Sequence, residues 1–381
     1  MVGTAGALYG ISGGGVPKSC GTSACGMVFQ LTPPVKSGGN WTLSTIYKFL
    51  GGSDGGNPVG RLLVGNKGAI YGVTFNGGNA ASSCDVMGCG TVFQLTPPVK
   101  TGGSWTKKTI YSFSGPDGAN PQAGVISDKL GNLHGTTSGG GDSNALAGIV
   151  FELSPPAVTG NPWTETLIHA FNPFDGRHDG YAPQAELVRT NGGALYGTTT
   201  NGSCSLICGT LFEAIPPNSE APIDFFGGID GSDPGQIILR NGIIYGLTTL
   251  GGNVRCDITI GCGEVFEWNG AKNVLFSFDV ASGRYPDAIV FDSTGALFVA
   301  AEGGGSNPSA CSGGGCGTIL KLSKSGSQWT PTKFHDFTGG ADGALPSSLI
   351  NNAGVLYGTT LSGGNLKLCQ GSGCGTVFKI Q

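Results

Sequence analysis

The sequence predicts an all-β fold, a seven-bladed β-propeller with about four strands per blade and with incomplete first and last blades. The first observation behind this prediction is an internal repeat. The first phrase of this repeat is an apolar residue followed, in most copies, by Tyr and Gly. Its seven copies begin at Leu8, Ile70, Leu133, Leu195, Ile244, Leu297 and Leu356. A second phrase, Gly-Thr-Val-Phe or a close variant, follows each copy and begins at Gly26, Gly90, Gly148, Gly209, Gly263, Gly317 and Gly375.

Two further phrases occur six times each and complete the repeat. One is an apolar run that ends in Phe, as at residues 46–49, and the other is a Pro followed by an apolar run, as at residues 58–64. All four phrases are short, rich in β-branched and aromatic residues, and bounded by Gly, Pro, Asn or Asp, which is typical of strands. Four strands in a unit of about fifty to sixty residues is the organisation of a propeller blade.

Within each blade we expect a fixed order of strands. The Pro-led run is strand A and lines the channel, the Tyr-Gly phrase is strand B, the Gly-Thr-Val-Phe phrase is strand C, and the run ending in Phe is the outer strand D. Strand D opens on a tryptophan in four repeats, at Trp41, Trp105, Trp163 and Trp329. We expect these indoles to pack between blades rather than to bind sugar.

The glycine content is the third observation. Gly accounts for 72 of the 381 residues, while 39% of the residues are hydrophobic. Gly costs a helix interior about 1 kcal/mol relative to Ala, so long helices are disfavoured. The apolar runs can still build a core, and no three-residue Gly period indicates collagen. We therefore expect one domain, residues 1–381, made of short strands joined by Gly-rich turns.

The predicted strands fall short of seven complete blades. The chain begins at a B strand and ends at a C strand, so the first blade lacks strand A and the last lacks strand D. Three explanations remain open. The native chain continues upstream, residues 1–6 supply a short strand, or a neighbouring molecule donates what is missing. An unpaired strand edge is a template for another chain, so the third explanation predicts chains or filaments.

Charge and hydropathy exclude several classes of partner. Lys and Arg number 20 against 24 Asp and Glu, without a basic stripe that would neutralise the phosphates of nucleic acid. No run of 18 apolar residues predicts a membrane span. The first residues do not resemble a signal peptide, yet twelve cysteines in close pairs indicate an oxidising compartment. We therefore expect an extracellular or cell-surface protein in a mature or trimmed form.

The cysteines occur as six local pairs in the predicted B–C loops. The pairs are Cys20 and Cys25, Cys84 and Cys89, Cys204 and Cys208, Cys256 and Cys262, Cys311 and Cys316, and Cys369 and Cys374. The third repeat has no cysteine in its loop, residues 142–147. Thiolate pairs also bind zinc, but a zinc site needs about four ligands and these spacings are irregular. We favour one disulfide per loop, each contributing roughly 2 kcal/mol, and predict no metal and no cofactor.

The predicted D–A loops carry Asp-Gly followed by Pro. The Asp residues are Asp54, Asp117, Asp175, Asp230 and Asp342, while the sixth member, Asp279-Val280, departs from the pattern. A ring of carboxylates could hold calcium, but one carboxylate per loop is too few for a hard-cation cage. Asp, Gly and Pro instead have the preferences that tight turns require, so we interpret these segments as turns.

Candidate sites for chemistry are sparse. The least repetitive stretch, Phe174 to Tyr181, brings together Asp175, Arg177, His178 and Asp179, and a small-molecule or glycan site is to be sought there first. Asn40 and Asn201 match the glycosylation acceptor pattern. The acidic residues outside the turns look like singletons, for example Glu152, Glu165, Glu186, Glu213 and Glu302. The remaining histidines, His134, His169 and His335, sit in no recurring motif with Cys, Ser or Asp, so we assign no catalytic residue.

The repeat resembles a known family. Leu195-Tyr196-Gly197-Thr198-Thr199, and Leu356-Tyr357-Gly358-Thr359-Thr360 followed by Gly363-Gly364 and Gly375-Thr376-Val377-Phe378, are similar to the GloVer tandem repeat of bacterial surface and exported proteins. The resemblance covers nearly the whole chain, and the sixth repeat departs from it at residues 298–301. It implies export and a propeller-like fold, without an activity or catalytic residues.

The function predicted from these observations is a non-enzymatic extracellular structural or interaction module. Its unfilled strand positions lead us to include self-assembly through strand edges. Two alternatives stay open, a glycan-binding propeller and an enzyme that acts on polysaccharide. The last would need at least two facing carboxylates.

Overall fold

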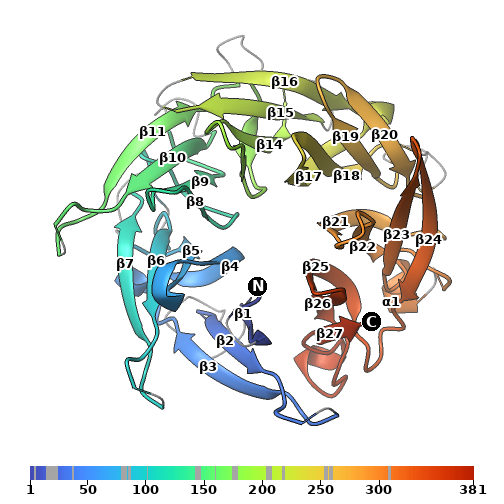
Figure 1. The fold of residues 1–381 in the computed structure, drawn as a ribbon, viewed down its shortest axis with the longest axis horizontal. Helices are drawn as coiled ribbons and strands as arrows, with labels where there is room; N and C mark the ends of the chain where they lie inside the picture. Colours follow the sequence, from blue (N-terminus) through green and yellow to red (C-terminus); the bar gives the residue numbers. More distant parts are fainter. Residues whose placement is uncertain are drawn as a thin grey trace. The chain divides into compact units, whose positions relative to one another are not determined.

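A computed structural model describes residues 1–3, 6–13, 25–36, 38–78, 84, 87–100, 102–141, 147–158, 160–173, 179–202, 208–216, 219–252, 256, 261–307 and 310–381. The chain divides into two compact units. The first unit comprises Met1–Gly197 and Phe212–Pro222, and the second comprises Thr198–Leu211 and Ile223–Gln381. Seven antiparallel sheets follow one another along the chain (Figure 1), and we number them in chain order.

The first three sheets belong to the first unit. The first sheet contains β1 (Leu8–Ser12), β2 (Met27–Thr32) and β3 (Thr42–Lys48). The second contains β4 (Gly56–Val64), β5 (Ile70–Asn76), β6 (Thr91–Thr96) and β7 (Thr106–Ser112). The third contains β8 (Ile126–Ser127), β9 (Leu133–Thr137), β10 (Ile149–Ser154) and β11 (Thr164–Ala170). Each sheet runs in chain order from its inner edge outward, as predicted.

The fourth sheet includes residues of both units. It contains β12 (Tyr181–Pro183), β13 (Val188–Arg189), β14 (Leu195–Asn201), β15 (Cys208–Ile215) and β16 (Ser219–Gly227). β12 and β13 both pair with β14, so the predicted A strand is interrupted here.

The last three sheets belong to the second unit. The fifth contains β17 (Ser232–Arg240), β18 (Ile243–Leu250), β19 (Glu264–Trp268) and β20 (Lys272–Ser277). The sixth contains β21 (Arg284–Phe291), β22 (Leu297–Gly303), β23 (Thr318–Ser325) and β24 (Gln328–Asp336). The seventh contains β25 (Ala344–Asn352), β26 (Val355–Ser362) and β27 (Val377–Ile380). The described helices are α1 (Ala310–Gly313) and four 3₁₀ turns at Gly52–Asp54, Asn66–Gly68, Gly228–Asp230 and Cys369–Gly371.

This architecture confirms the predicted fold class, a seven-bladed β-propeller with three strands in its first and last sheets. The N-terminal residues partly occupy the empty inner position of the first sheet. Val2 forms a bridge with Leu8, and the Tyr9 N–H donates to the Met1 carbonyl at 2.9 Å. This isolated bridge lies where one of the three explanations placed a short strand from residues 1–6, of which residues 4 and 5 lie outside the described residues. Among the described residues, no helix is long and apolar enough to cross a membrane.

A glycine and a phenylalanine face each other at the centre of most sheets. Gly72 lies opposite Phe93, and Gly135 lies opposite Phe151. A Cβ on either glycine would stand 2.6 Å from the Cζ of the facing ring. Both rings are fully buried, so they could not move aside. The Gly of the Tyr-Gly phrase is therefore required because the Phe of the next phrase fills the space of its missing side chain.

The sixth sheet shows the same pairing with both partners changed. Val299 stands in the glycine position, and Leu320 lies directly opposite it in place of Phe. Both side chains are buried. The two departures from the motif compensate each other. Val299 is larger than the usual glycine of strand B, and Leu320 is smaller than the usual phenylalanine of strand C.

Neighbouring sheets join through a second recurring contact, next to the cysteine loops. The residue before the Pro of strand A has a left-handed backbone, as at Asn57 and Asn120, both with φ 56°. Its N–H donates to the carbonyl of the second cysteine of the preceding sheet, for example Asn120 to Cys89 at 2.7 Å. The Pro then covers the Gly after that cysteine, because a Cβ on Gly90 would stand 2.6 Å from the Cδ of Pro121.

Aromatic side chains complete each joint. The fully buried Phe that follows strand D packs edge-to-face on the C-strand Phe of the next sheet, as Phe113 does on Phe151 with ring centroids 5.2 Å apart. The Trp before strand D packs on the B-strand Tyr of the preceding sheet, with centroids 6.1 Å apart for Tyr9 and Trp105. Trp163 and Trp329 make the same contact. These three indoles pack between blades, as the sequence predicted.

The Gly–Phe pairing predicts a specific coupling in the third sheet. Gly135→Val should destabilise the protein by about 1–3 kcal/mol, because the new side chain overlaps the buried Phe151 ring. Combining it with Phe151→Leu should recover part of that loss, since this recreates the pair found in the sixth sheet. Urea unfolding of both single variants and the double variant measures the coupling. Strictly additive effects would show that the two residues do not share this space.

Candidate functional site

Four of the six predicted cysteine pairs are disulfides between described residues. The bonds join Cys84–Cys89, Cys256–Cys262, Cys311–Cys316 and Cys369–Cys374, with Cα–Cα separations of 5.2 to 5.4 Å. Cys25 and Cys208 are also disulfide-bonded, and their predicted partners, Cys20 and Cys204, lie outside the described residues. Three of these four bridges close a loop whose second cysteine accepts an N–H of the next sheet at its carbonyl, at Cys89, Cys262 and Cys316, so they belong to the scaffold.

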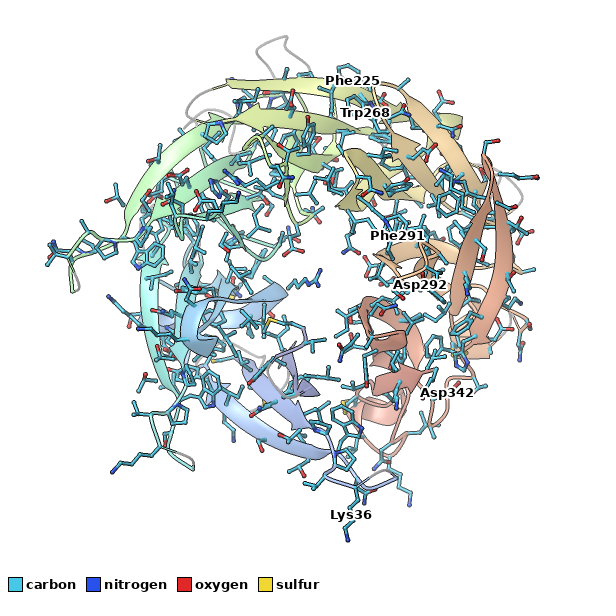
Figure 2. The ribbon with its side chains drawn as sticks, viewed as in Figure 1. Lys36, Phe225, Trp268, Phe291, Asp292 and Asp342 are labelled. Carbon is cyan, nitrogen blue, oxygen red and sulfur yellow. A yellow bond between two sulfur atoms is a disulfide. The ribbon has the colours of Figure 1, made fainter. Side chains whose placement is uncertain are left out.

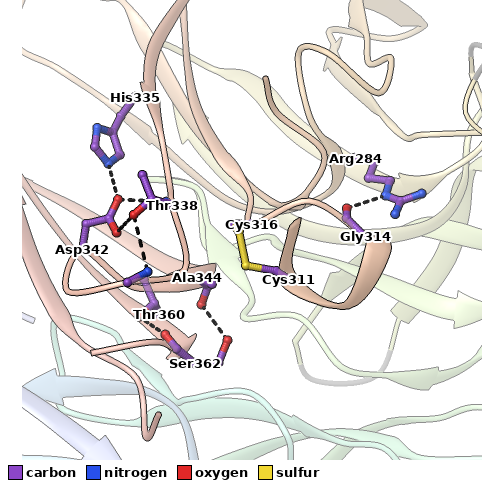
Figure 3. The surroundings of a disulfide bond; sticks show 11 residues. Arg284, Cys311, Gly314, Cys316, His335, Thr338, Asp342, Ala344, Thr360 and Ser362 are labelled. Carbon is purple, nitrogen blue, oxygen red and sulfur yellow. Dashed lines mark hydrogen bonds and ion pairs between the residues drawn. A yellow bond between two sulfur atoms is a disulfide. The ribbon is translucent and has the colours of Figure 1, made fainter. Parts of the chain in front are cut away.

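In several of these turns a side chain of the preceding D strand contacts the Asp carboxylate. Tyr47 donates its hydroxyl to Asp54 at 2.7 Å, and Tyr111 donates to Asp117 at 2.6 Å. In the last of these turns, His335 lies 3.6 Å from the Asp342 carboxylate, and Thr338 also hydrogen-bonds it (Figure 3). The turn interpretation therefore accounts for the hydrogen bonding of these carboxylates.

Two turns correct the sequence interpretation. In the turn that leads into the fourth sheet, the buried Asp179 occupies the position equivalent to Asp54, four residues before the Pro, and His169 contacts its carboxylate at 2.8 Å. Asp179 therefore takes the position at which the sequence interpretation placed Asp175. Asp175, Arg177 and His178 lie outside the described residues, so the ligand site suggested there stays a prediction. In the turn that leads into the sixth sheet, Ser282 takes the Asp position, and its N–H donates to the Asp279 carboxylate at 2.8 Å.

Three of the five glutamates that looked like singletons have a hydrogen-bond or ion-pair partner, and the other two lie near an aspartate. Glu152 contacts His134 at 3.0 Å, and burial lowers the pKa of that imidazole. Glu213 accepts the Tyr196 hydroxyl at 2.5 Å. A third glutamate, Glu186, lies 3.9 Å from Arg61. The remaining two, Glu165 and Glu302, each face an aspartate. Sequence reasoning missed these pairs because their members come from different strands or loops.

The pair Asp287 and Glu302 lies at the inner edge of the sixth sheet. Asp287 sits in a bulge of β21, directly after Pro286, and Glu302 lies near the end of the paired strand β22. β21 is an edge strand that contacts the corresponding strands β17 and β25. The third sheet has an amide and a hydroxyl at the same two positions, where Gln122 donates to Ser138 at 2.9 Å. The sixth sheet therefore replaces a neutral hydrogen bond with two carboxyl groups.

The surroundings of this pair favour the protonated forms. Burial raises the pKa of Asp287 to about 6. Burial and, to a smaller extent, the Asp287 charge raise the pKa of Glu302 to about 7. The Asp287 side chain is nevertheless exposed to solvent. Raised pKa values in two neighbouring carboxyl groups are a property of candidate acid–base residues.

A different kind of surface lies at the loops between strands C and D. Val35 in the β2–β3 loop and Val99 in the β6–β7 loop are fully exposed, with relative accessibilities of 104% and 102%. Both stand in the sequence Pro-Pro-Val-Lys, and Figure 2 shows Lys36 at the outward tip of its loop. The third sheet has Pro155-Pro156-Ala157-Val158 at the same place, and Val158 is 63% exposed.

The bases of the first two loops are built alike. Gly39 donates its N–H to the Lys36 carbonyl at 3.1 Å, and Gly103 donates to the Lys100 carbonyl at 3.0 Å. The second Pro of each loop packs on that glycine, where a Cβ would stand 2.9 Å from the Pro Cβ in both cases. Identical bases present the two valines in the same way. The fifth and sixth sheets instead join strands C and D by short turns without proline.

The two glycosylation candidates differ in their surroundings. Asn40 is exposed at the end of the β2–β3 loop. Asn201 is half-buried, and its side-chain amide donates to the Thr200 hydroxyl at 3.1 Å. Ser203 of its acceptor sequence lies outside the described residues. Modification at either site stays a prediction.

Comparison with known proteins identifies the family. The family described as the Gloeobacter/Verrucomicrobia repeat matches residues 1–260, and the chain belongs to it. This confirms the resemblance inferred from the repeated phrases. No curated protein matches the chain.

Solved structures of other propellers share the fold. A putative 6-phosphogluconolactonase from Bacteroides uniformis is 16% identical, with a TM-score of 0.54 over 92% of this chain and 88% of that chain. A protein from Lactobacillus plantarum is 12% identical, with a TM-score of 0.54 over 93% and 95%. An ulvan lyase of polysaccharide lyase family PL25, bound to -[GlcA(1-4)Rha3S]-, is 10% identical, with a TM-score of 0.54 over 94% and 88%. At these identities the likeness concerns the fold alone.

The carboxyl pair predicts a measurable change in titration. Asp287→Asn should lower the pKa of Glu302 from about 7, because a neighbouring negative charge is removed, while burial should keep it above its usual value. NMR titration of the glutamate side-chain carboxyl carbons measures this shift. Asp233→Asn is the matched control, because Asn57 and Asn120 occupy its equivalent position, and it should leave Glu302 unchanged. An unchanged Glu302 titration in Asp287→Asn would show that the two groups do not interact.

Proposed function

We propose that the protein is an extracellular, non-enzymatic interaction module that binds a partner through its Pro-Pro-Val-Lys loops. The observation that carries this proposal is the presentation of the same fully exposed valine on matched bases in two successive sheets, at Val35 and Val99. Single exposed apolar residues are normal on protein surfaces. Repetition of one such residue on a proline-stiffened loop favours a contact with a partner.

The rest of the repeat supports the same function, because its recurring residues serve the scaffold. The cysteine carbonyl, the Pro, the Trp and the Asp of the turns all join or brace neighbouring sheets. The paired cysteines favour an oxidising compartment, and hence export. A rigid body with loops at fixed positions is suited to bivalent binding, in which the second contact forms at a high effective concentration.

The loops also indicate the chemistry of the partner. Consecutive prolines restrict the backbone to extended conformations, which recognition grooves lined by aromatic residues accept at low entropic cost. Lys36 and Lys100 follow the two valines and add a positive charge to each tip. We therefore expect a protein surface with aromatic grooves and acidic rims. Self-association through strand edges remains part of the proposal, as a way of multiplying these loops.

Substitution of the two valines tests this function. Val35→Ser or Val99→Ser alone should weaken binding, and the double variant should lose at least about a hundredfold in affinity, because bivalent binding is removed. The protein, immobilised, is presented with surface and secreted proteins of the producing organism, and the captured partner is purified for calorimetry. Sedimentation velocity of the free protein measures self-association in parallel.

A matched control shows whether loss of any exposed apolar side chain weakens binding. Leu130 is 81% exposed in a turn outside these loops, so Leu130→Ser should leave binding unchanged. All variants should unfold within about 0.5 kcal/mol of the wild type, since exposed positions contribute little to stability. Equal binding by the wild type and the double valine variant would exclude the loops as the binding surface.

A second candidate function rests on the carboxyl pair of the sixth sheet. Asp287 and Glu302 are two neighbouring carboxyl groups whose pKa values are raised to about 6 and about 7, and an enzyme acting on polysaccharide would need a pair of carboxyl groups that face each other. The fold-level likeness to an ulvan lyase is compatible with this function. It ranks second because the surroundings of the pair do not identify a sugar-binding surface.

A depolymerisation assay distinguishes the second candidate from the first. Acidic and neutral polysaccharides are incubated with the wild type and with Glu302→Gln, and released chain ends are measured. For an enzyme, activity should depend on pH between about 6 and 7, and Glu302→Gln should reduce it by at least about a hundredfold. Val35→Ser should leave that activity unchanged. A panel without turnover by the wild type would count against this candidate and not against the loops.

A further inference from the structure

The joints between neighbouring sheets differ at one charged position. In the second sheet Lys107 lies on β7, and its ammonium group donates to the carbonyl of Asp54 at 2.6 Å and to the Asp54 carboxylate at 3.0 Å. Asp54 belongs to the turn that leads into this sheet. The same ammonium group bonds the Thr109 hydroxyl at 2.6 Å. The hydrogen bonds of this lysine therefore connect the outer strand of the second sheet to the turn that follows the first sheet.

The fifth sheet repeats this arrangement. Lys272 on β20 donates to the carbonyl of Asp230, in the turn that leads into its own sheet. Its ammonium group also lies 3.5 Å from the Glu264 carboxylate and 5.1 Å from the centroid of the Phe226 ring. Lys107 lies over Phe49 in the same way, at 5.9 Å. Two separate joints therefore place a positive charge at one position of the repeat.

The third sheet has a glutamate at this position. Glu165 pairs with Leu153, just as Lys107 pairs with Leu95, and both precede the buried Phe after their strand by six residues. Its neighbour is Asp117, the equivalent of Asp54. Three hydrogen bonds already hold the Asp117 carboxylate, from the Tyr111 hydroxyl at 2.6 Å and from the N–H and hydroxyl of Ser114 at 2.7 and 2.8 Å.

In the second and fifth sheets the lysine at this position donates hydrogen bonds to the preceding turn, and an ionised Glu165 has no proton with which to do so. Its Oε1 atom is buried without a hydrogen bond among the described residues. Among the residues that the structure describes, the charged and titratable groups near it are Asp117, from the turn, and Tyr111, from β7. Within this part of the chain, an ionised Glu165 would therefore meet a second carboxylate without a cation between them. A protonated Glu165 has an O–H that can donate to the oxygens that Lys107 uses in the sister joint.

We propose that the joint between the second and third sheets is a pH-responsive contact, closed by a hydrogen bond from protonated Glu165 to Asp117 and loosened when Glu165 ionises. β7 and β11 are the outer strands of the second and third sheets and follow the proline loops of these sheets, so loosening of the joint changes how those loops are held relative to each other. The proposal does not depend on the proposed function, because it concerns a joint of the scaffold.

The direction of the pH effect follows from linkage. Burial, followed by the Asp117 charge, raises the pKa of Glu165 from 4.5 to about 7. The contribution of this joint to stability is therefore complete below pH about 4.5 and is lost as the pH rises through about 7. One unit of pKa corresponds to a tenfold change in the ratio of folded to unfolded protein. Partial exposure of Glu165 reduces the effect, so we expect about a tenfold change in that ratio.

Replacing Glu165 by a neutral or a positively charged residue tests the proposal. Urea unfolding and hydrogen exchange of residues 164–170 are followed between pH 5 and pH 8, with a chelator present to exclude metal binding. Relative to Glu165→Gln, the wild type should lose about tenfold in the folded-to-unfolded ratio over this range, and β11 should exchange faster at pH 8. Glu165→Lys should restore the joint of the second sheet, with greater protection of β11 at pH 8.

A reciprocal variant keeps the test specific. Lys107→Glu should transfer the pH dependence to the joint between the first and second sheets, seen as faster exchange of β7 at high pH. Other titrating groups affect all variants equally, so the differences between variants isolate the position. Identical pH profiles for the wild type, Glu165→Gln and Glu165→Lys would overturn the proposal, whatever the folding yield of Lys107→Glu.

Discussion

The contact between a glycine and the proline of the next sheet sets the spacing on which the other interactions of this propeller depend. At Gly90 the backbone has φ 94°, and a Cβ would collide with Pro121. Because the proline ring reaches this backbone, the residue before it, Asn120, is brought within 2.7 Å of the Cys89 carbonyl. That hydrogen bond requires Asn120 to adopt a left-handed backbone, which costs an ordinary residue about 1 kcal/mol or more and persists only where its surroundings enforce it. The glycine, the carbonyl and the proline therefore act as one unit.

The third repeat shows which part of this unit is indispensable. It has no cysteine, and Ala147 stands where the others have the second cysteine of the pair. The Ala147 carbonyl still accepts the N–H of Ala182 at 2.7 Å, and Pro183 still covers Gly148. The joint thus needs the carbonyl and the glycine, whereas the sulfur atoms act through the loop that carries them. A disulfide restricts that loop in the unfolded chain and so favours the conformation that presents the carbonyl.

The sequence was sufficient for most of the strands, for their order and for four of the six cysteine pairs, because each of these depends on a few neighbouring residues. It was misleading where the spacing to a distant partner decides the outcome. Asp175-Gly176 and Asp179-Gly180 look alike as dipeptides, but only Asp179 stands four residues before Pro183, and the proline fixes the turn. Glu302 looked isolated because its neighbour Asp287 lies in a bulge of the paired strand β21. Pairing across strands, and not local composition, determines such contacts.

The scaffold also explains why ionisable pairs arise at a few repeats without loss of the fold. The joints depend on backbone groups, glycines and prolines, so the side chains at neighbouring positions are under weaker constraint. One position holds lysine in the second and fifth sheets and Glu165 in the third, while another holds Gln122 in the third sheet and Asp287 in the sixth. In each case the backbone geometry of the sister repeat is kept and the charge is altered. The residues of the joints are therefore shared by the repeats, whereas the charges at these two positions belong to individual sheets.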